Sequence, residues 1–125
     1  MPVLKEFVKI KKGGRFLSLH IKYASRLSTE LALDMEVKDG DTIHFFRDEV
    51  KPDNWYLAKN QNDKHGAVIR KRKGRYGYVF FYSAFAKEIN EIYRQNKDLI
   101  KIKVGPKTMI DKKPYWPLIT AQLFK

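Results

Sequence analysis

The sequence predicts a mainly β fold with two short helices, of the α+β class, in which two ββαββ repeats close into one pseudo-symmetric barrel. Three observations support this prediction. Several short stretches alternate apolar with polar residues and are rich in β-formers. Two other stretches carry apolar residues at helical spacing, and the same order of elements recurs about sixty residues further along the chain.

The first repeat spans residues 1–62. Gly13-Gly14 is expected to form a two-residue turn between its first two strands, because glycine accepts the positive φ angles of such turns. Leu27 and Leu31 have the spacing of one helical face and predict a short helix. The expected elements are strands at 6–11 and 15–22, a helix at 25–33, and strands at 42–46 and 55–59.

The second repeat spans residues 63–125, and the polar segment 59–66 joins it to the first. Lys73-Gly74 stands where the first repeat has its glycine turn, and Trp116 stands where the first repeat has Trp55. The expected elements are a strand at 76–82, a helix with Phe85, Ile89 and Ile92 on one face, and strands at 99–104 and 116–120.

The two repeats are expected to form one composite domain over residues 1–125. A unit of about sixty residues with one short helix buries little apolar surface by itself. Closing the strands of both units on each other buries more, and a barrel leaves no exposed sheet edges. If a pseudo-twofold axis relates the repeats, the two hairpin tips should project to the same side of the barrel. Such a pseudo-dimer is consistent with a monomeric protein.

Composition excludes several classes of site. The chain has no cysteine, so it cannot form a disulfide, use a thiol nucleophile or ligate zinc through sulfur. No stretch has the length and apolar character of a signal peptide or a membrane span. The expectation is therefore a soluble, cytoplasmic protein that does not bind membranes.

The charge is strongly basic and unevenly distributed. The formal net charge is +12, a balance typical of proteins with polyanionic partners. Residues 1–62 hold 11 basic and 9 acidic side chains, a net of +2, whereas residues 63–125 hold 15 basic and 5 acidic, a net of +10. The hairpin of the second repeat is therefore expected to supply most of the attraction to nucleic acid, and the hairpin of the first repeat mainly to set the orientation.

The two predicted hairpins carry the candidate nucleic-acid contacts. Long cationic side chains follow a phosphate backbone, and arginine also reads guanine edges. For the first hairpin taken alone, lysines that protect an edge strand are the favoured alternative. The candidate residues are Lys11, Lys12 and Arg15 in the first hairpin, Arg70, Lys71, Arg72, Lys73 and Arg75 in the second, and Lys101, Lys103 and Lys107 as an extension of the surface.

The aromatic residues of the second hairpin have two interpretations. Strand alternation places Tyr76, Tyr78 and Phe80 on one face, and Val79 and Phe81 on the other. Rings beside cations stack on the bases of single-stranded nucleic acid, which makes Tyr76, Tyr78 and Phe80 candidates for stacking. The favoured interpretation is that these rings belong to the core.

One stretch resembles a known DNA-binding module. In "SLHIKYASRLSTELALDMEVKDGDTIHFF", a strand and a short helix lead through the Gly40-Asp41 turn into an apolar strand, and "WYLAK" follows as a closing strand. This order is similar to the AbrB/MraZ-type swapped-hairpin module, although the proline that commonly precedes its helix is absent. The resemblance implies two interleaved ββαββ units, sequence-specific binding to duplex DNA, and a role in transcription regulation.

Catalysis and metal binding receive no support from the sequence. His20, His44 and His65 are isolated, and no carboxylate stands at metal-ligand spacing from them. The acidic residues around Gly40 are explained by turn chemistry. No enzyme activity, metal or cofactor is therefore expected.

The leading hypothesis is a non-enzymatic protein that binds double-stranded DNA. One alternative is a Whirly-like protein that binds single-stranded nucleic acid. The other alternative is an adaptor or antitoxin-like module that grips a protein partner.

Overall fold

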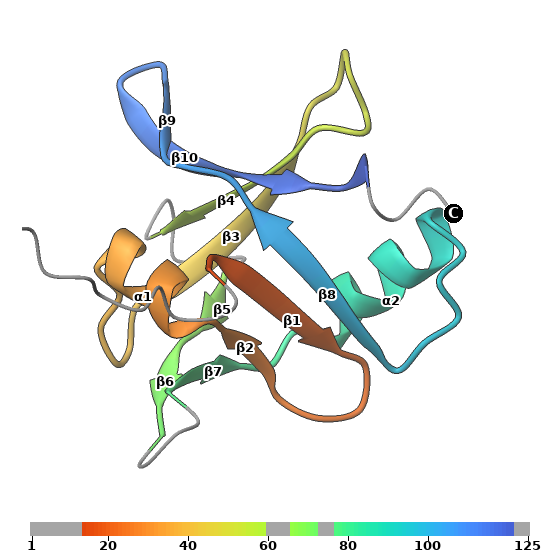
Figure 1. The fold of residues 1–125 in the computed structure, drawn as a ribbon, viewed down its shortest axis with the longest axis horizontal. Helices are drawn as coiled ribbons and strands as arrows, with labels where there is room; N and C mark the ends of the chain where they lie inside the picture. Colours follow the sequence, from red (N-terminus) through yellow and green to blue (C-terminus); the bar gives the residue numbers. More distant parts are fainter. Residues whose placement is uncertain (1–13, 60–65, 73–76, 122–125) are drawn as a thin grey trace, which may run out of the picture.

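In the computed structural model, residues 14–59, 66–72 and 77–121 are described, and they form ten strands and two helices (Figure 1). All ten strands belong to one antiparallel sheet system. The elements in chain order are β1 Phe16–His20, β2 Ser25–Leu27, α1 Thr29–Met35, β3 Thr42–Arg47, β4 Trp55–Lys59, β5 Ala67–Val68, β6 Arg70–Lys71, β7 Tyr78–Phe80, α2 Ser83–Ile92, β8 Leu99–Val104, β9 Thr108–Ile110 and β10 Lys113–Ile119.

The sheet closes on itself as a barrel. Its strand order is β5-β3-β4-β10-β8-β1-β2-β7-β6, and β9 pairs with β10 outside this path. The two ends of the order meet because only Ile69 separates β5 from β6. Residues 67–71 therefore border both ends of the strand order. Next to β3, the Ile69 N–H donates to the Asp41 carbonyl at 2.7 Å. Next to β7, Arg70 pairs with Val79. The prediction of a mainly β barrel with two helices is confirmed.

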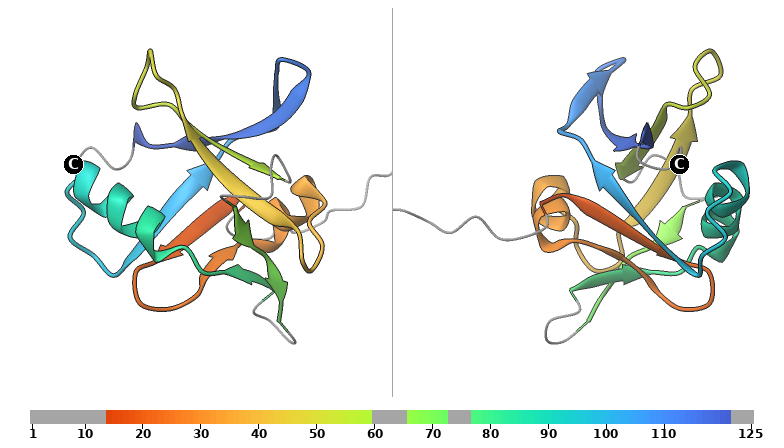
Figure 2. Two further views of the ribbon diagram at one scale, coloured as in Figure 1. Left: turned by 180° about the vertical axis from the view of Figure 1, so that it is seen from behind. Right: turned by 45° about the vertical axis from the view of Figure 1, so that its right-hand side comes forward.

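The two helices lie at opposite ends of the barrel in all three views (Figures 1 and 2). Each helix turns one apolar face inward: α1 buries Leu31, Ala32 and Met35, and α2 buries Phe85, Ala86 and Ile89. The helical spacing of Phe85 and Ile89 therefore predicted α2 correctly. Neither described helix is long and apolar enough to cross a membrane.

The start of α1 differs from the prediction. Residues 25–27, expected to open the helix, form strand β2, which buries Ser25 and Leu27 and exposes Arg26. The helix begins after Ser28, whose Oγ accepts a hydrogen bond from the Leu31 N–H at 3.3 Å. The same Oγ accepts from the Phe16 N–H at 2.9 Å and so ties the helix start to β1. Serine is a strong N-cap, and this local chemistry prevailed over the apolar spacing.

The strand predictions are confirmed for β3, β4 and β8, while others differ in extent or were missed. The strand expected at 76–82 is shorter, as β7, and the one expected at 116–120 begins earlier, as β10. The short strands β2, β5 and β9 were not predicted, and β6 corresponds to the first strand of the predicted second hairpin, for which no bounds were predicted. A turn at Asp111 and Lys112, with φ angles of 50° and 66°, joins β9 to β10. Turns of this kind usually contain glycine, so this sequence gives little sign of one.

Several predicted features lie outside the described residues. These are the strand at 6–11, the tip of the second hairpin at Lys73-Gly74, and Gly13 in the tip of the first. The expectation that both tips face one way therefore stays a prediction, as does the division of the chain at residue 62.

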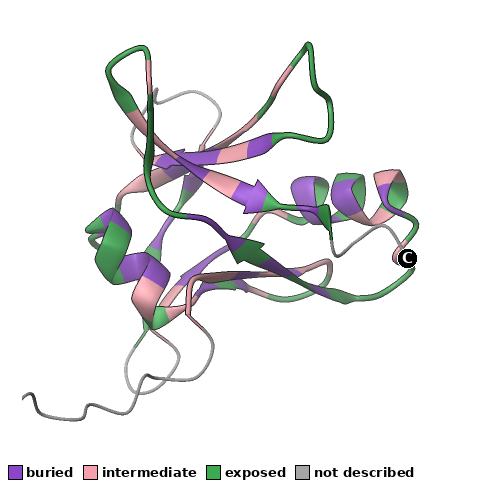
Figure 3. Cartoon of the chain, turned by 45° about the horizontal axis from the view of Figure 1, so that its top comes forward, coloured by how far each residue is buried: buried purple, intermediate pink, exposed green. Residues whose placement is uncertain are grey.

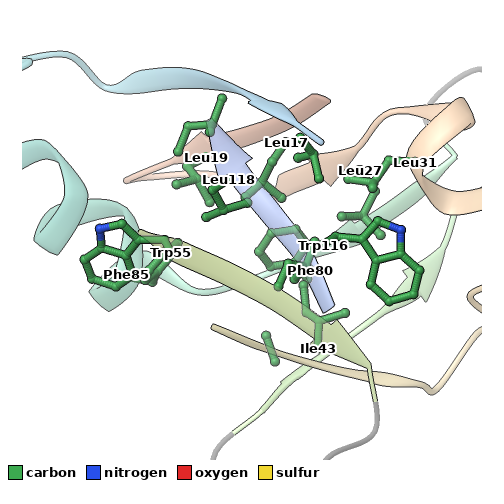
Figure 4. Packing of buried hydrophobic residues seen from close by; sticks show 14 of the residues in the cluster. Leu17, Leu19, Leu27, Leu31, Ile43, Trp55, Phe80, Phe85, Trp116 and Leu118 are labelled. Atoms are coloured by element: carbon green, nitrogen blue, oxygen red, sulfur yellow. The ribbon is translucent and has the colours of Figure 1, made fainter. Parts of the chain in front are cut away.

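Two tryptophans join the halves of the core in a reciprocal way. Trp55 on β4 packs edge-on against Phe85 of α2, and its Nε1 donates to the Tyr93 hydroxyl at 3.0 Å. Trp116 on β10 donates through Nε1 to Asp34 Oδ2 of α1, also at 3.0 Å. Figure 4 shows Trp55 beside Phe85 at one side of the core and Trp116 near Leu31 at the other. Each tryptophan therefore contacts the helix from the other half of the sequence.

Candidate nucleic-acid interface

A row of paired residues crosses the outer face of five neighbouring strands. The register runs Lys101 on β8, Ser18 on β1, Arg26 on β2, Val79 on β7 and Arg70 on β6. Residues paired directly across antiparallel strands point to the same side of a sheet. Three cations from distant parts of the sequence therefore share one face, and these strands follow one another from the centre to the bottom of Figure 1.

The row continues at both margins with two more cations. Lys103 lies two residues beyond Lys101, pairs with Phe16, and keeps the same outward direction. Figure 3 shows the alternation of exposed and buried residues on β8. Arg72 lies two residues beyond Arg70, and its N–H donates to the Gly77 carbonyl at 2.7 Å, which extends the pairing of β6 with β7. We refer to the exposed side chains of Arg26, Arg70, Arg72, Lys101 and Lys103 as the basic face.

Most acidic residues lie away from this face, and an exception at its margin is Asp39, whose Oδ1 accepts the backbone N–H of Lys71 at 2.8 Å. None of the described strands contains Asp or Glu. The described acids lie in α1 and the turn after it, in the β3–β4 turn, in α2, and at Asp98 and Asp111. Within the described parts of the chain, no residue of the basic face forms an ion pair with an acid. The five cations therefore have no described carboxylate paired with them, although the Asp39 carboxylate lies beside Lys71.

A hollow of about 500 Å³ opens on the same face. Its lining is mostly apolar, and the buried Val79 belongs to it. Two cations of the basic face, Arg26 and Arg72, contribute to its wall, and exposed apolar surface comes from Tyr23 and Leu99. The hollow therefore combines an apolar surface with adjacent positive charge.

The turn from β1 to β2 contributes two rings, His20 and Tyr23, to the lining of the hollow. The His20 Nδ1 accepts the backbone N–H groups of Lys22 at 3.1 Å and of Tyr23 at 3.0 Å. Because Nδ1 accepts both bonds, the neutral ring carries its proton on Nε2. The rings of His20 and Tyr23 lie 4.8 Å apart, and Tyr23 is 71% exposed. The ring of Tyr23 is therefore exposed, while hydrogen bonds to His20 order the backbone that carries it.

The structure brings some of the predicted cations together and separates others. Arg70, Arg72, Lys101 and Lys103 share the basic face, as the register above shows. The remaining predicted cations are not part of the basic face as described. Lys71 is exposed but alternates with Arg70, and Lys107 is exposed in the loop before β9. Lys11, Lys12, Lys73 and Arg75 lie outside the described residues.

The Arg15 side chain contacts neighbouring elements of the fold. Its Nε donates to the Val104 carbonyl at 3.3 Å, and its Nη1 lies 4.0 Å from Asp34 Oδ2. The same carboxylate oxygen accepts the Trp116 N–H. The guanidinium therefore joins β1 to β8 and to α1, and it is not part of the basic face.

As the alternation predicts, successive residues of β7 point to opposite faces of the sheet. Tyr78 and Phe80 point toward the core. Phe80 is 0% exposed and packs near Phe45, with ring centroids 6.2 Å apart. Its ring has no face free for a base, so the stacking role predicted for Phe80 is wrong and the core interpretation holds. Tyr78 is half-buried against the core. Phe81 is 63% exposed, and Tyr76 lies outside the described residues.

Sequence reasoning missed Arg26, Tyr23 and Leu99. Arg26 was assigned to a helix, because the apolar residues around it have helical spacing. The available signal was Ser28 followed by Thr29 and Glu30, which is typical of a helix start and would have left Arg26 in a strand.

The described residues offer little for acid–base or metal chemistry. They contain no group of three or more His, Cys, Asp or Glu side chains that would hold a metal ion. His44 is buried with its Nε2 3.3 Å from Thr42 Oγ1, and His65 lies outside the described residues. Backbone N–H groups of Lys51 and Val50 hold the pKa of Asp48 below its ordinary value, which favours an ionised turn-capping carboxylate rather than a proton donor.

No protein-family model, curated protein or solved structure matches the chain. The resemblance of residues 18–46 to the AbrB/MraZ-type module therefore stays an expectation from the sequence.

Proposed function

We propose that this protein binds nucleic acid without catalysing a reaction, and that the basic face is its contact surface. One observation carries the proposal: four exposed cations lie on β8, β2 and β6, a fifth, Arg72, directly follows β6, and none of the described strands contains an acidic residue. A polyanion gains from such a surface because it replaces its condensed counterions with fixed positive charges.

The dimensions of the face suit a chain of phosphates. Neighbouring strands lie about 4.8 Å apart, so the four steps from β8 to β6 span roughly 19 Å along the curved sheet. That path accommodates several consecutive phosphate groups. Cations at both ends of the path, and Arg26 between them, would fix the direction of the backbone.

Two forms of nucleic acid fit a row of cations. The resemblance to the AbrB/MraZ-type module favours duplex DNA and a role in transcription regulation. The apolar hollow within the basic face favours a strand with unpaired bases. Contacts to phosphate alone do not distinguish the two forms, since both offer them.

The proposal predicts a steep dependence of affinity on salt. With five phosphate contacts, the logarithm of the association constant should fall against the logarithm of salt concentration with a slope of about −3.5 for a single strand or −4.5 for a duplex. Between 50 and 200 mM salt this corresponds to a loss of affinity of about 100- to 500-fold. Fluorescence anisotropy with labelled oligonucleotides measures it.

Single-stranded and duplex oligonucleotides of equal phosphate number provide the two arms of this measurement. A slope shallower than about −1 in both arms would contradict the proposal, because so few released counterions are incompatible with the basic face as the contact surface. Binding that is weak in both arms, together with a stoichiometric acidic protein partner, would favour the adaptor hypothesis instead.

A further inference from the structure

The hollow on the basic face has the size and chemistry of a small-molecule site. Its volume of about 500 Å³ lies within the usual range of such sites, which is about 300–1,000 Å³. Val79 contributes buried apolar surface, and Leu99 adds an exposed aliphatic side chain. Such a lining favours a flat, largely apolar group, and the neighbouring cations favour a group that carries negative charge beside it.

Tyr23 is placed to contact such a group through its ring. It lines the hollow and is 71% exposed, so its ring remains available to a ligand. The two hydrogen bonds to His20 Nδ1 brace the backbone of the turn that carries it. A backbone ordered in this way loses less conformational entropy when the turn binds a ligand.

Arg26 and Arg72 place positive charge at the wall of the same hollow. Arg26 is also the central cation of the row that joins Lys101 to Arg70. A phosphate backbone that follows this row therefore passes the hollow. A base attached to that backbone reaches the hollow only if it is not held in a base-paired stack.

We infer that the hollow binds one unstacked base of a single-stranded nucleic acid, with Tyr23 as the stacking side chain and Arg26 and Arg72 beside the adjoining phosphates. This inference rests on the proposed function, because it uses the basic face to bring the strand to the hollow. It makes an unpaired strand the preferred ligand, because a duplex would have to extrude a base at an energetic cost.

The test measures the affinity of the full chain for two single-stranded oligonucleotides by fluorescence anisotropy at one low salt concentration. One probe is a short thymidine homopolymer, and the other has the same number of phosphates but abasic sugars. The variants are Tyr23→Ala, Tyr23→Phe, and Leu33→Ala as a control. Leu33 has the same 71% exposure as Tyr23 but lies on α1, away from the hollow.

We expect the unmodified chain to bind the thymidine probe more tightly than the abasic probe. Tyr23→Ala should weaken binding of the thymidine probe about 10- to 100-fold and leave binding of the abasic probe unchanged. Tyr23→Phe, which keeps a ring, and Leu33→Ala should both bind like the unmodified chain.

Three outcomes would overturn the inference in distinguishable ways. Equal affinity for the two probes, with Tyr23→Ala without effect, would remove the base site but leave nucleic-acid binding by the basic face intact. Absence of binding to both probes at low salt would remove the proposed function together with the base site. A loss of affinity for both probes in Tyr23→Ala would assign Tyr23 to backbone contact or folding, and would also overturn the inference.

Discussion

Replacing Arg26 and Arg70 together with glutamate is expected to weaken nucleic-acid binding on the order of 100-fold at low salt. The two residues flank Val79 in the cross-strand row, and both are exposed, so the exchange places one negative charge at the centre of the basic face and another at its β6 end. The salt slope should become shallower by about 2, because about two phosphate contacts are lost. Anisotropy titrations at several salt concentrations measure both quantities.

A matched control separates local charge from total charge. Lys51 in the β3–β4 turn and Lys87 on α2 are also exposed, and their exchange for glutamate changes the net charge by the same amount. This control should retain most of the affinity and most of the salt slope. Equal losses in the two double variants would mean that binding follows the overall charge of the chain rather than the basic face.

The second large effect concerns folding. Exchanging Trp55 or Trp116 for alanine is expected to lower the free energy of unfolding by about 3–5 kcal/mol. Both side chains are almost fully buried, with exposures of 6% and 3%, and each donates a hydrogen bond to a residue from the opposite half of the sequence. Domains of this size have total stabilities of about 5–15 kcal/mol, so either variant should be close to unfolding. Urea denaturation followed by far-ultraviolet circular dichroism measures the change.

The reciprocal contacts also predict that both halves unfold together in either variant. Removal of the Tyr93 hydroxyl by Tyr93→Phe provides a milder comparison, because it takes away the acceptor of the Trp55 N–H while both rings stay, and it should cost about 1–3 kcal/mol. Amide hydrogen exchange distinguishes one cooperative unit from two. If β3 and β4 lost protection in Trp55→Ala while β8 and β10 kept it, the account of a single interlocked core would be wrong.

The longer strands of the barrel could be predicted from the sequence because apolar and polar residues alternate along them. The pattern of Leu99 to Val104, with alternate residues buried, shows why β8 was assigned correctly. The two-residue strands β5 and β6 are too short to show a period. The partner of β5 is β3, which is distant in sequence, so the closure of the barrel at Ile69 required three-dimensional information.

Only part of the candidate site could be predicted from the sequence, because its residues also come together through pairing between strands. Charge counts identified the cations around Arg70 and Lys101, but local spacing does not show that four strand steps bring them onto one face. Alternation separated Val79 from Phe80 without revealing which face is core. The answer depends on Phe45 of β3, which packs against Phe80 across the barrel interior. The hollow depends in the same way on the β1–β2 turn, on Arg72 and on four strands, β1, β2, β7 and β8, which come together only in the fold.

The most direct test of the central claim is an NMR titration of the full chain with a single-stranded oligonucleotide, in which backbone amide shifts map the contact surface. A chain of 14.8 kDa is suitable for this measurement. The account predicts that the largest shifts cluster on β8, β1, β2, β7 and β6, centred on Ser18, Arg26 and Val79. Shifts confined to β3, β4 and β10, or spread evenly over the helices and turns, would contradict it.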